Sequence, residues 1–233
     1  MLSVNGFIKT FGYAKLFLQG IVCTVSLSFL TVIIGFILAV ILAVMRLGKN
    51  KILKLFATIY VEVFRATPML VQIFIIYYIV FNGVKVLPGY MLFGFIRFER
   101  FFPGVVALAL NSGAYLSEII RSGIQSIDIG QTEAARSLGM SQYQNMKLII
   151  LPQAIKNVLP AIANEFVTII KESAICYTIG VQDIMSAVNA VKGATFSIAE
   201  PLIVAAFLYF CLTYPTSKVI EHFERKMSVG DKR

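Results

Sequence analysis

The chain alternates long apolar runs with short polar connections, and this pattern predicts membrane-spanning helices. The stretch from Leu16 to Met45 contains no charged residue, and it exceeds the roughly 20 apolar residues that cross a hydrocarbon core. It is also too long for the apolar region of a signal peptide. Four further runs carry a few polar residues and cover about Leu55–Phe81, Pro103–Ile124, Gln153–Ile170 and Pro201–Ile220. We therefore predict an all-α integral membrane protein with about five transmembrane helices.

Proline positions predict where these helices begin or break. Pro103 and Pro201 are expected to open the third and fifth spans, because proline is favoured at the first helical position. Thr67 and Pro68 are expected to break or bend the second span, which frees backbone groups that only protein or a cavity can satisfy. The segment Glu172–Ala199 is too polar for a span and predicts a short external helix or a partly embedded hairpin. No repeat or linker is visible, so residues 1–233 are predicted to form one transmembrane domain.

Composition supports a membrane protein and changes the interpretation of the charge. The chain is 58% hydrophobic with a mean hydropathy of +0.81, against about 45–50% apolar residues in soluble domains. In a membrane protein, the net charge of +9 is explained by the placement of Lys and Arg in the loops. We therefore expect no nucleic-acid partner. Lys and Arg favour cytoplasmic loops, and their bias predicts an external N-terminus and a cytoplasmic C-terminus. The three cysteines show no metal-ligand spacing, and no metal site is predicted.

The segment Gln125–Pro152, between the third and fourth spans, predicts two short helices in the cytoplasm. Gln131–Leu138 is rich in helix formers, and Gly139 follows where a left-handed C-terminal cap is favoured. Ser141 and Gln144 have the spacing of a capping box at the start of the second helix, which is expected to continue until Pro152 opens the next span. The segment has an apolar face that either binds a partner or packs on the ends of the spans: Leu138, Met140, Tyr143 and Met146.

The spacing within this segment resembles the EAA loop of ABC-importer permeases. The residues that carry the resemblance are Glu133, Ala134, Ala135, Gly139, Ile149, Leu151 and Pro152. Four other segments are similar to the polar amino-acid branch of that family, which takes up histidine, glutamine, glutamate or arginine: residues 64–72, 114–121, 164–166 and 171–174. Ala66 departs from the branch, where glycine is common, but both residues are small.

This resemblance implies a type I ABC-importer fold and a set of partners. In the family, the EAA loop is a coupling helix that docks on a separate ATPase dimer, which holds ATP and Mg. The resemblance also implies an extracytoplasmic substrate-binding protein, a second permease chain in a homodimer or heterodimer, and a bacterial-type inner membrane whose lipid surrounds the spans. This chain is then expected to hold no cofactor and to be no enzyme itself.

Polar residues within the spans are candidate contacts for the substrate, because an ionisable group in a membrane helix needs a partner or a polar cavity. Glu165 is the foremost candidate, since its carboxylate is suited to the ammonium or the basic side chain of an amino acid. The alternative is a structural ion pair, for example with Arg65. The remaining candidates offer hydrogen-bonding groups or a charge: Asn164, Arg65, Thr67, Asn111 and Ser173.

The sequence also weighs against two other functional classes. A stand-alone secondary amino-acid transporter remains the alternative, but many such carriers show repeated halves, which are not visible here. A membrane-embedded enzyme would need a cluster of catalytic side chains. The chain has no G-x-x-x-x-G-K-[ST] nucleotide-binding loop, so ATP hydrolysis is expected on another subunit.

Overall fold

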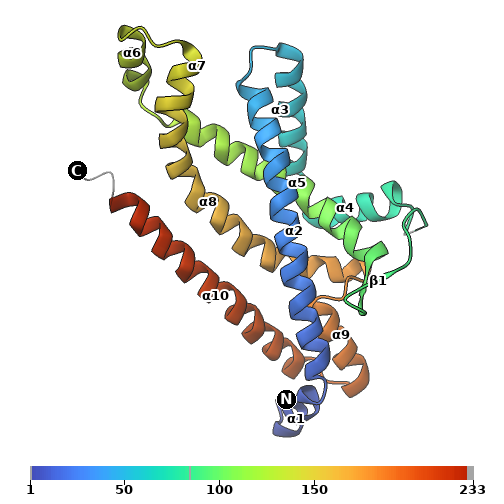
Figure 1. The fold of residues 1–233 in the computed structure, drawn as a ribbon. Coiled ribbons are helices and arrows are strands. Elements are labelled where there is room, and N and C mark those ends of the chain that lie inside the picture. The colour runs from blue at the N-terminus through green and yellow to red at the C-terminus, as the bar shows by residue number, and fades with distance from the viewer. Residues whose placement is uncertain (1, 84, 230–233) are drawn as a thin grey trace.

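The first apolar run forms the longest helix of the fold. The computed structural model describes residues 2–83 and 85–229. Helix α2 (Ala14–Leu47) follows a short helix α1 (Val4–Phe11) and is crossed diagonally by α5 (Phe98–Gln125) (Figure 1). Glycine allows the close approach of these two helices, because a Cβ atom at Gly35 would lie 3.3 Å from the Ala109 carbonyl oxygen. Small residues at such crossings are typical of membrane helix pairs.

The second span is broken at the position that the sequence predicts. Helix α3 (Lys51–Ala66) ends where Thr67 adopts extended backbone angles, as a residue before proline prefers. The chain continues as α4 (Met69–Phe74) and the π-helical turn η1 (Ile75–Val80), bent by 110° relative to α3. Within the described residues, four helices are long and apolar enough to cross a membrane, and this bent pair makes a fifth span if it is counted as one.

The third span begins earlier than predicted. Two short antiparallel strands, β1 (Met91–Leu92) and β2 (Ile96–Arg97), lead directly into α5. The expectation that Pro103 opens this helix is therefore wrong, because α5 begins at Phe98 and includes Pro103. Aromatic packing stabilises the extra turn: the Phe98 ring stacks on Tyr90 with a centroid distance of 4.5 Å and on Phe102 at 5.3 Å.

The predicted helical segment between the third and fourth spans forms α6 (Ile129–Ser137) and α7 (Gln142–Asn145). Gly139 has the expected left-handed conformation with φ +80°, and Ser141 and Gln144 form the predicted capping box. Helix α6 starts two residues earlier than predicted because the Asp128 carboxylate accepts a hydrogen bond from the Gly130 N–H at 2.6 Å.

The second loop helix and the fourth span form one continuous helical run. Helix α7 passes through the π-helical turn η2 (Met146–Ile150) into α8 (Leu151–Glu172). Pro152 therefore does not open a separate helix as predicted. It lies in the first turn of α8, immediately after π-type bonding in which the Leu151 N–H donates to the Met146 carbonyl. The π turn absorbs the irregularity that proline introduces.

The polar segment after the fourth span folds as a packed helical hairpin. A 3-10 helix, η3 (Ser173–Ile179), ends at Gly180, which has φ +82°, and α9 (Ile184–Thr195) follows. Helix α10 (Ala199–Val229) completes the fold, and it begins two residues before Pro201, which was expected to open it. Pro201 still lies in the first helical turn. Backbone N–H groups in this turn have no intrahelical acceptor, so the lack of an N–H in proline costs no helical hydrogen bond.

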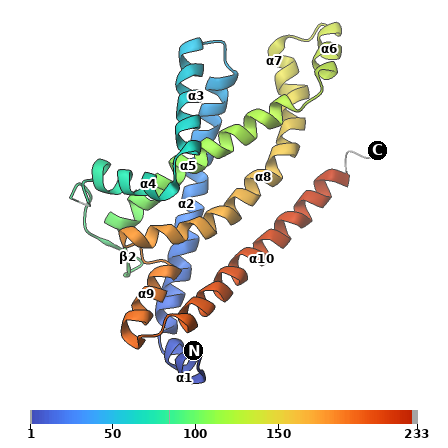
Figure 2. The same ribbon diagram turned by 180° about the vertical axis from the view of Figure 1, so that it is seen from behind.

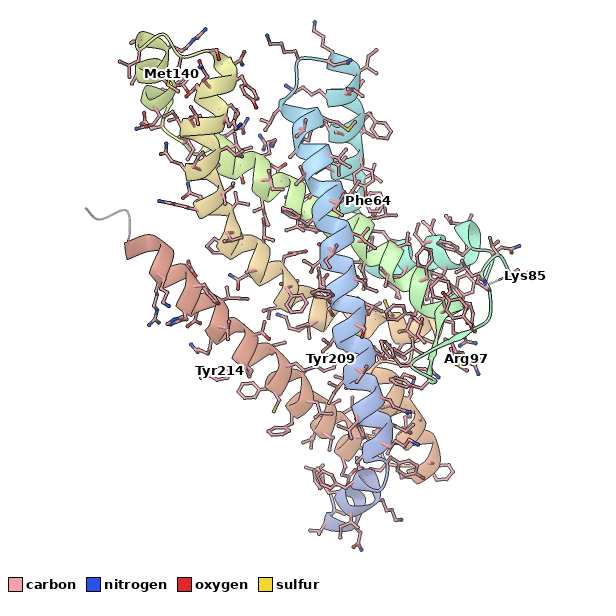
Figure 3. All side chains as sticks on the ribbon, viewed as in Figure 1. Phe64, Lys85, Arg97, Met140, Tyr209 and Tyr214 are labelled. Carbon is pink, nitrogen blue, oxygen red and sulfur yellow. The ribbon has the colours of Figure 1, made fainter. Side chains whose placement is uncertain are left out.

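Helices α8 and α10 diverge towards the end of the molecule that carries α6 and α7, as both ribbon views show (Figures 1 and 2). Only 6% of the apolar window of α10 is buried within the chain. Tyr209 on α10 faces α2, whereas Tyr214 projects away from the rest of the chain (Figure 3). Most of the α10 surface is therefore not covered by the other described residues of the chain.

A buried carboxyl group lies where α2, α9 and α10 meet. Asp183 is 1% exposed, and its Oδ1 atom caps α9 by accepting from the Ser186 N–H at 2.8 Å. Its Oδ2 atom has no hydrogen-bond partner among the described residues. Burial raises the pKa of Asp183 from 3.8 to about 7, because the charged form loses its hydration. The titratable side chains on which Asp183 acts electrostatically are Cys23, Cys176 and Tyr209.

This burial predicts a stability that falls as the pH rises. The folded chain retains the Asp183 proton between about pH 4 and 7 while the unfolded chain releases it, so the free energy of unfolding decreases across this window by about 4 kcal/mol. Asp183→Asn removes this dependence. Thermal unfolding of wild type and variant at pH 4 to 8 measures it, and parallel curves for the two proteins would contradict the assignment.

Candidate functional site

The candidate carboxylate Glu165 lies half-buried on α8, where this helix packs on α5. The hydroxyl group of Ser112, on α5, lies beside the Glu165 carboxyl group. Ser112 is 2% exposed and has no well-formed hydrogen bond to a described residue. Glu172 lies two turns further along α8 and acts electrostatically on Glu165. Two carboxyl groups and an unused hydroxyl together favour a ligand that carries positive charge and hydrogen-bond donors.

Gln72 forms the centre of a hydrogen-bonded cluster at the break in the second span. Its Nε2 atom donates to the Phe64 carbonyl at 2.8 Å, to the Thr67 carbonyl at 3.0 Å and to the Thr67 hydroxyl at 2.7 Å. Its Oε1 atom accepts from Asn111 Nδ2 at 2.8 Å. One buried amide thus satisfies the carbonyl groups of Phe64 and Thr67 at the end of α3, and the Thr67 hydroxyl donates to the Val63 carbonyl at 2.8 Å.

This cluster connects the broken span to the candidate site. Asn111, which holds Gln72, immediately precedes Ser112, which faces Glu165. The structure therefore brings together three predicted residues, Thr67, Asn111 and Glu165, through two residues that the sequence analysis did not assign. A glutamine shortly after a helix break was the signal for Gln72, but its partner Asn111 lies 39 residues away in the sequence.

Removing the Gln72 amide is expected to destabilise the fold. In Gln72→Leu, the Thr67 carbonyl group loses the partner that Gln72 provides, whereas Asn111 Nδ2 and the Phe64 carbonyl retain only the longer hydrogen bond of 3.3 Å between them. Each buried group that stays unsatisfied costs about 1–3 kcal/mol. The melting temperature in detergent should fall by several degrees. Gln182→Leu is the matched control, since Gln182 is only half-buried and accepts one backbone hydrogen bond of 3.3 Å. Equal melting temperatures for the Gln72 variant and wild type would contradict a structural role.

Three other predicted substrate residues lie outside this cluster. Arg65 is exposed and lies over the Tyr115 ring, 5.6 Å from its centroid, so the alternative of an Arg65–Glu165 ion pair is not realised in the described structure. Asn164 is exposed on α8. Ser173 is fully buried and donates to the Ile170 carbonyl at 2.7 Å, so its hydroxyl group is already used within the turn.

A three-residue ion cluster fixes α2 to α5 near the loop end of the molecule. Glu118 pairs with Arg121 on the same helix, as its spacing suggests, and also with Arg46 at the end of α2. The Arg46 side chain is 10% exposed. This second pair depends on the tertiary structure, and it holds the two most extensively packed helices together.

The candidate coupling residues form an exposed end of the molecule. Glu133, Ala134 and Gly139 are exposed, as are Leu151 and Pro152; Ile149 is half-buried, and Ala135 faces inward at 4% exposure. Met140 lies in the turn between α6 and α7 (Figure 3). Leu138 and Tyr143 are 83% and 71% exposed, so packing on the spans does not cover this apolar face within the chain. The described residues contain no cluster of three or more metal-ligating side chains.

Comparisons with known proteins agree with these features. Residues 31–229 match the family "binding-protein-dependent transport system inner membrane component". The putative glutamine transport system permease protein GlnP of Rickettsia typhi is 40% identical over 223 residues, which cover 96% of this chain and 98% of the relative. The arginine transport system permease protein ArtQ of Bacillus subtilis is 39% identical over 214 residues, which cover 92% and 93% of the two chains.

A solved structure gives the same result for the fold. A chain from the crystal structure of an amino acid ABC transporter with histidines superposes with a TM-score of 0.87 and 42% identity, and the match covers 97% of this chain and 100% of that chain. The sequence-based expectation of a type I ABC-importer permease fold is confirmed. The chain therefore belongs to the family of inner membrane components of binding-protein-dependent transport systems.

Proposed function

We propose that the chain forms the membrane path of an ATP-driven importer for polar amino acids, including basic ones. The observation that carries this proposal is the placement of Glu165 beside the Ser112 hydroxyl in a chain of this family. A carboxylate binds the ammonium group of any amino acid, and Glu172 adds negative charge for a basic side chain. Asn164 and Arg65 extend the site along α8 and α3, and Thr67, Asn111 and Ser173 position the surrounding backbone.

The substrate class also draws on the relatives. Those described above are named for glutamine and arginine, and the solved transporter was crystallised with histidines. All three amino acids carry an ammonium group and a side chain with hydrogen-bond donors. The alternative of a stand-alone secondary transporter is not supported, because the relatives and the solved chain are permease components of multi-subunit systems.

The structure suggests how a partner's ATP cycle moves the site. Helices α7, η2 and α8 form one helical run, so the coupling residues Ile149, Leu151 and Pro152 lie on the same helical rod as Glu165. Pro152 and Glu165 are about 20 Å apart along it at about 1.5 Å per residue. A separate ATPase dimer, which holds ATP and Mg, docks on the α6–α7 end, and its closure tilts this rod and changes the access to Glu165.

The remaining partners follow from the same assignment. The permease pairs with a second permease chain and receives its substrate from an extracytoplasmic binding protein. It lies in a bacterial-type inner membrane with its N-terminus outside and its C-terminus in the cytoplasm. The basic residues near α6, α7 and the end of α2 support this orientation through the positive-inside rule.

Reconstitution tests the proposed function directly. The permease is placed in proteoliposomes with its ATPase and binding protein, and the uptake of radiolabelled glutamine, histidine, arginine, glutamate and leucine is measured. We expect ATP-dependent uptake of the polar amino acids and little uptake of leucine. Uptake that follows an imposed ion gradient without ATP, or that favours leucine, would contradict the proposal.

A further inference from the structure

An apolar groove of about 650 Å³ lies between α2, α5 and α8, apart from the polar cluster around Glu165. Every residue that lines it is Val, Ile, Leu, Phe or Ala. Ala154 and Ala43 are buried at 2% and 1% exposure, whereas Phe36 and Val44 on the α2 wall are 40% and 64% exposed. A zwitterionic amino acid finds no hydrogen-bonding side chain here, so the groove is not part of the proposed substrate path.

The length of the groove suits a lipid chain better than a second spanning helix. Its α2 wall extends from Val32 to Leu47, which is about 22 Å at 1.5 Å per residue. A hydrocarbon core is about 30 Å thick, and a spanning helix needs about 20 residues. The groove is therefore shorter than the hydrocarbon core that a spanning helix crosses, and it ends at the same level as α2 itself.

Basic residues surround this end of the groove on all three of its walls. Lys49 follows Leu47 by two residues, Arg121 lies between the lining residues Ile120 and Ile124 in the last turns of α5, and Lys147 precedes Leu151 by about one turn. Lys49 and Lys147 are exposed, and Arg121 is half-buried. The nearest acidic group, Glu118, is already shared by Arg46 and Arg121, so this end retains positive charge.

We propose that the groove binds an acyl chain of an anionic phospholipid, whose phosphate lies among Lys49, Arg121 and Lys147. The apolar walls supply contact with the chain, and the basic residues discriminate between headgroups. Each basic residue near an anionic lipid surface contributes about a fivefold preference over a neutral lipid. The inference requires only that the chain spans a membrane, and it does not depend on the proposed substrate.

The sequence contains no tryptophan, so the fluorescence of a single introduced tryptophan can test the proposal directly. The groove reporter, Phe36→Trp, places one emitter on the groove wall. The α10 reporter, Phe210→Trp, places one outside the groove, where Phe210 is 56% exposed. Each full-length variant is reconstituted in zwitterionic vesicles that contain increasing fractions of brominated phosphatidylglycerol or brominated phosphatidylcholine. Fluorescence quenching then shows which lipid contacts each position.

We expect the fluorescence of the groove reporter to reach half-quenching at an about 25-fold lower fraction of the anionic lipid than of the neutral lipid, because Lys49 and Lys147 contribute about fivefold each and Arg121 is already paired with Glu118. The α10 reporter should respond equally to both lipids. In the groove reporter, Lys49→Gln with Lys147→Gln should reduce the preference to about fivefold or less, since only Arg121 remains. Lys54→Gln, which removes an exposed charge on α3 outside the groove, should retain it.

Two outcomes would overturn the proposal. The first is equal quenching of the groove reporter by both lipids, since the basic residues would then select no headgroup. The second is protection of the groove reporter from both lipids while the α10 reporter is quenched. The groove would then be covered by protein, such as a second copy of the chain.

Discussion

Glu165→Gln is expected to reduce amino-acid uptake by about 10- to 100-fold while the transporter complex remains assembled. The substitution preserves the shape of the side chain but removes the negative charge, and a hydrogen bond to a charged group is worth about 1.5–3 kcal/mol. The loss should be largest for arginine, whose side chain adds a second positive charge. ATP-dependent uptake in proteoliposomes over a range of substrate concentrations separates an increase in KM from a decrease in the maximal rate.

Glu62→Gln is the matched control for this experiment. Glu62 is an exposed glutamate on α3, and it has no role in the cluster around Gln72 or in the proposed site. Uptake by this variant should resemble that of wild type. Unchanged kinetics in the Glu165 variant would refute the proposed contact, and a loss confined to complexes that fail to assemble would point to a structural role instead.

Gly139→Pro is expected to abolish binding of the ATPase while the permease still inserts in the membrane. Gly139 has φ +80°, whereas proline is held near about −65°, so the turn between α6 and α7 cannot form. The exposed Leu138 and Tyr143 then lose their relative positions. Co-purification of the ATPase with tagged permease measures the effect, and the amount of permease in the membrane fraction controls for insertion.

A graded pair of variants separates the turn from the docking contact. Gly139→Ala retains the backbone at a cost of roughly 1–2 kcal/mol, so partial co-purification is expected. Glu133→Lys leaves the turn intact but reverses an exposed charge, and it should also prevent docking, whereas Glu224→Lys on α10 should not. Normal recovery of the ATPase with Gly139→Pro would show that this loop is not the coupling element.

Several features of the fold follow from local chemistry and were therefore predictable. The uninterrupted apolar run of α2, the break at Thr67 and Pro68, the left-handed Gly139 and the capping box of Ser141 each depend on neighbouring residues only. The helix bounds were less predictable where packing contributes. Pro103 lies inside α5 because aromatic stacking around Phe98 stabilises the preceding turn, and no local pattern encodes that contact.

The candidate site shows the same division. Glu165 was recognisable from sequence because a charge within an apolar helix is costly, and Glu133 to Pro152 were recognisable from their spacing. The contacts between residues of the site were not recognisable from the sequence. Gln72 and Asn111 are 39 residues apart, and Ser112 meets Glu165 only because α5 and α8 cross. The sequence alone thus determined that the chain spans a membrane and carries a two-helix loop between its third and fourth spans, because hydropathy and turn chemistry act over a few residues. The tertiary structure alone decided which polar groups meet, because hydrogen bonds between helices depend on how the helices cross.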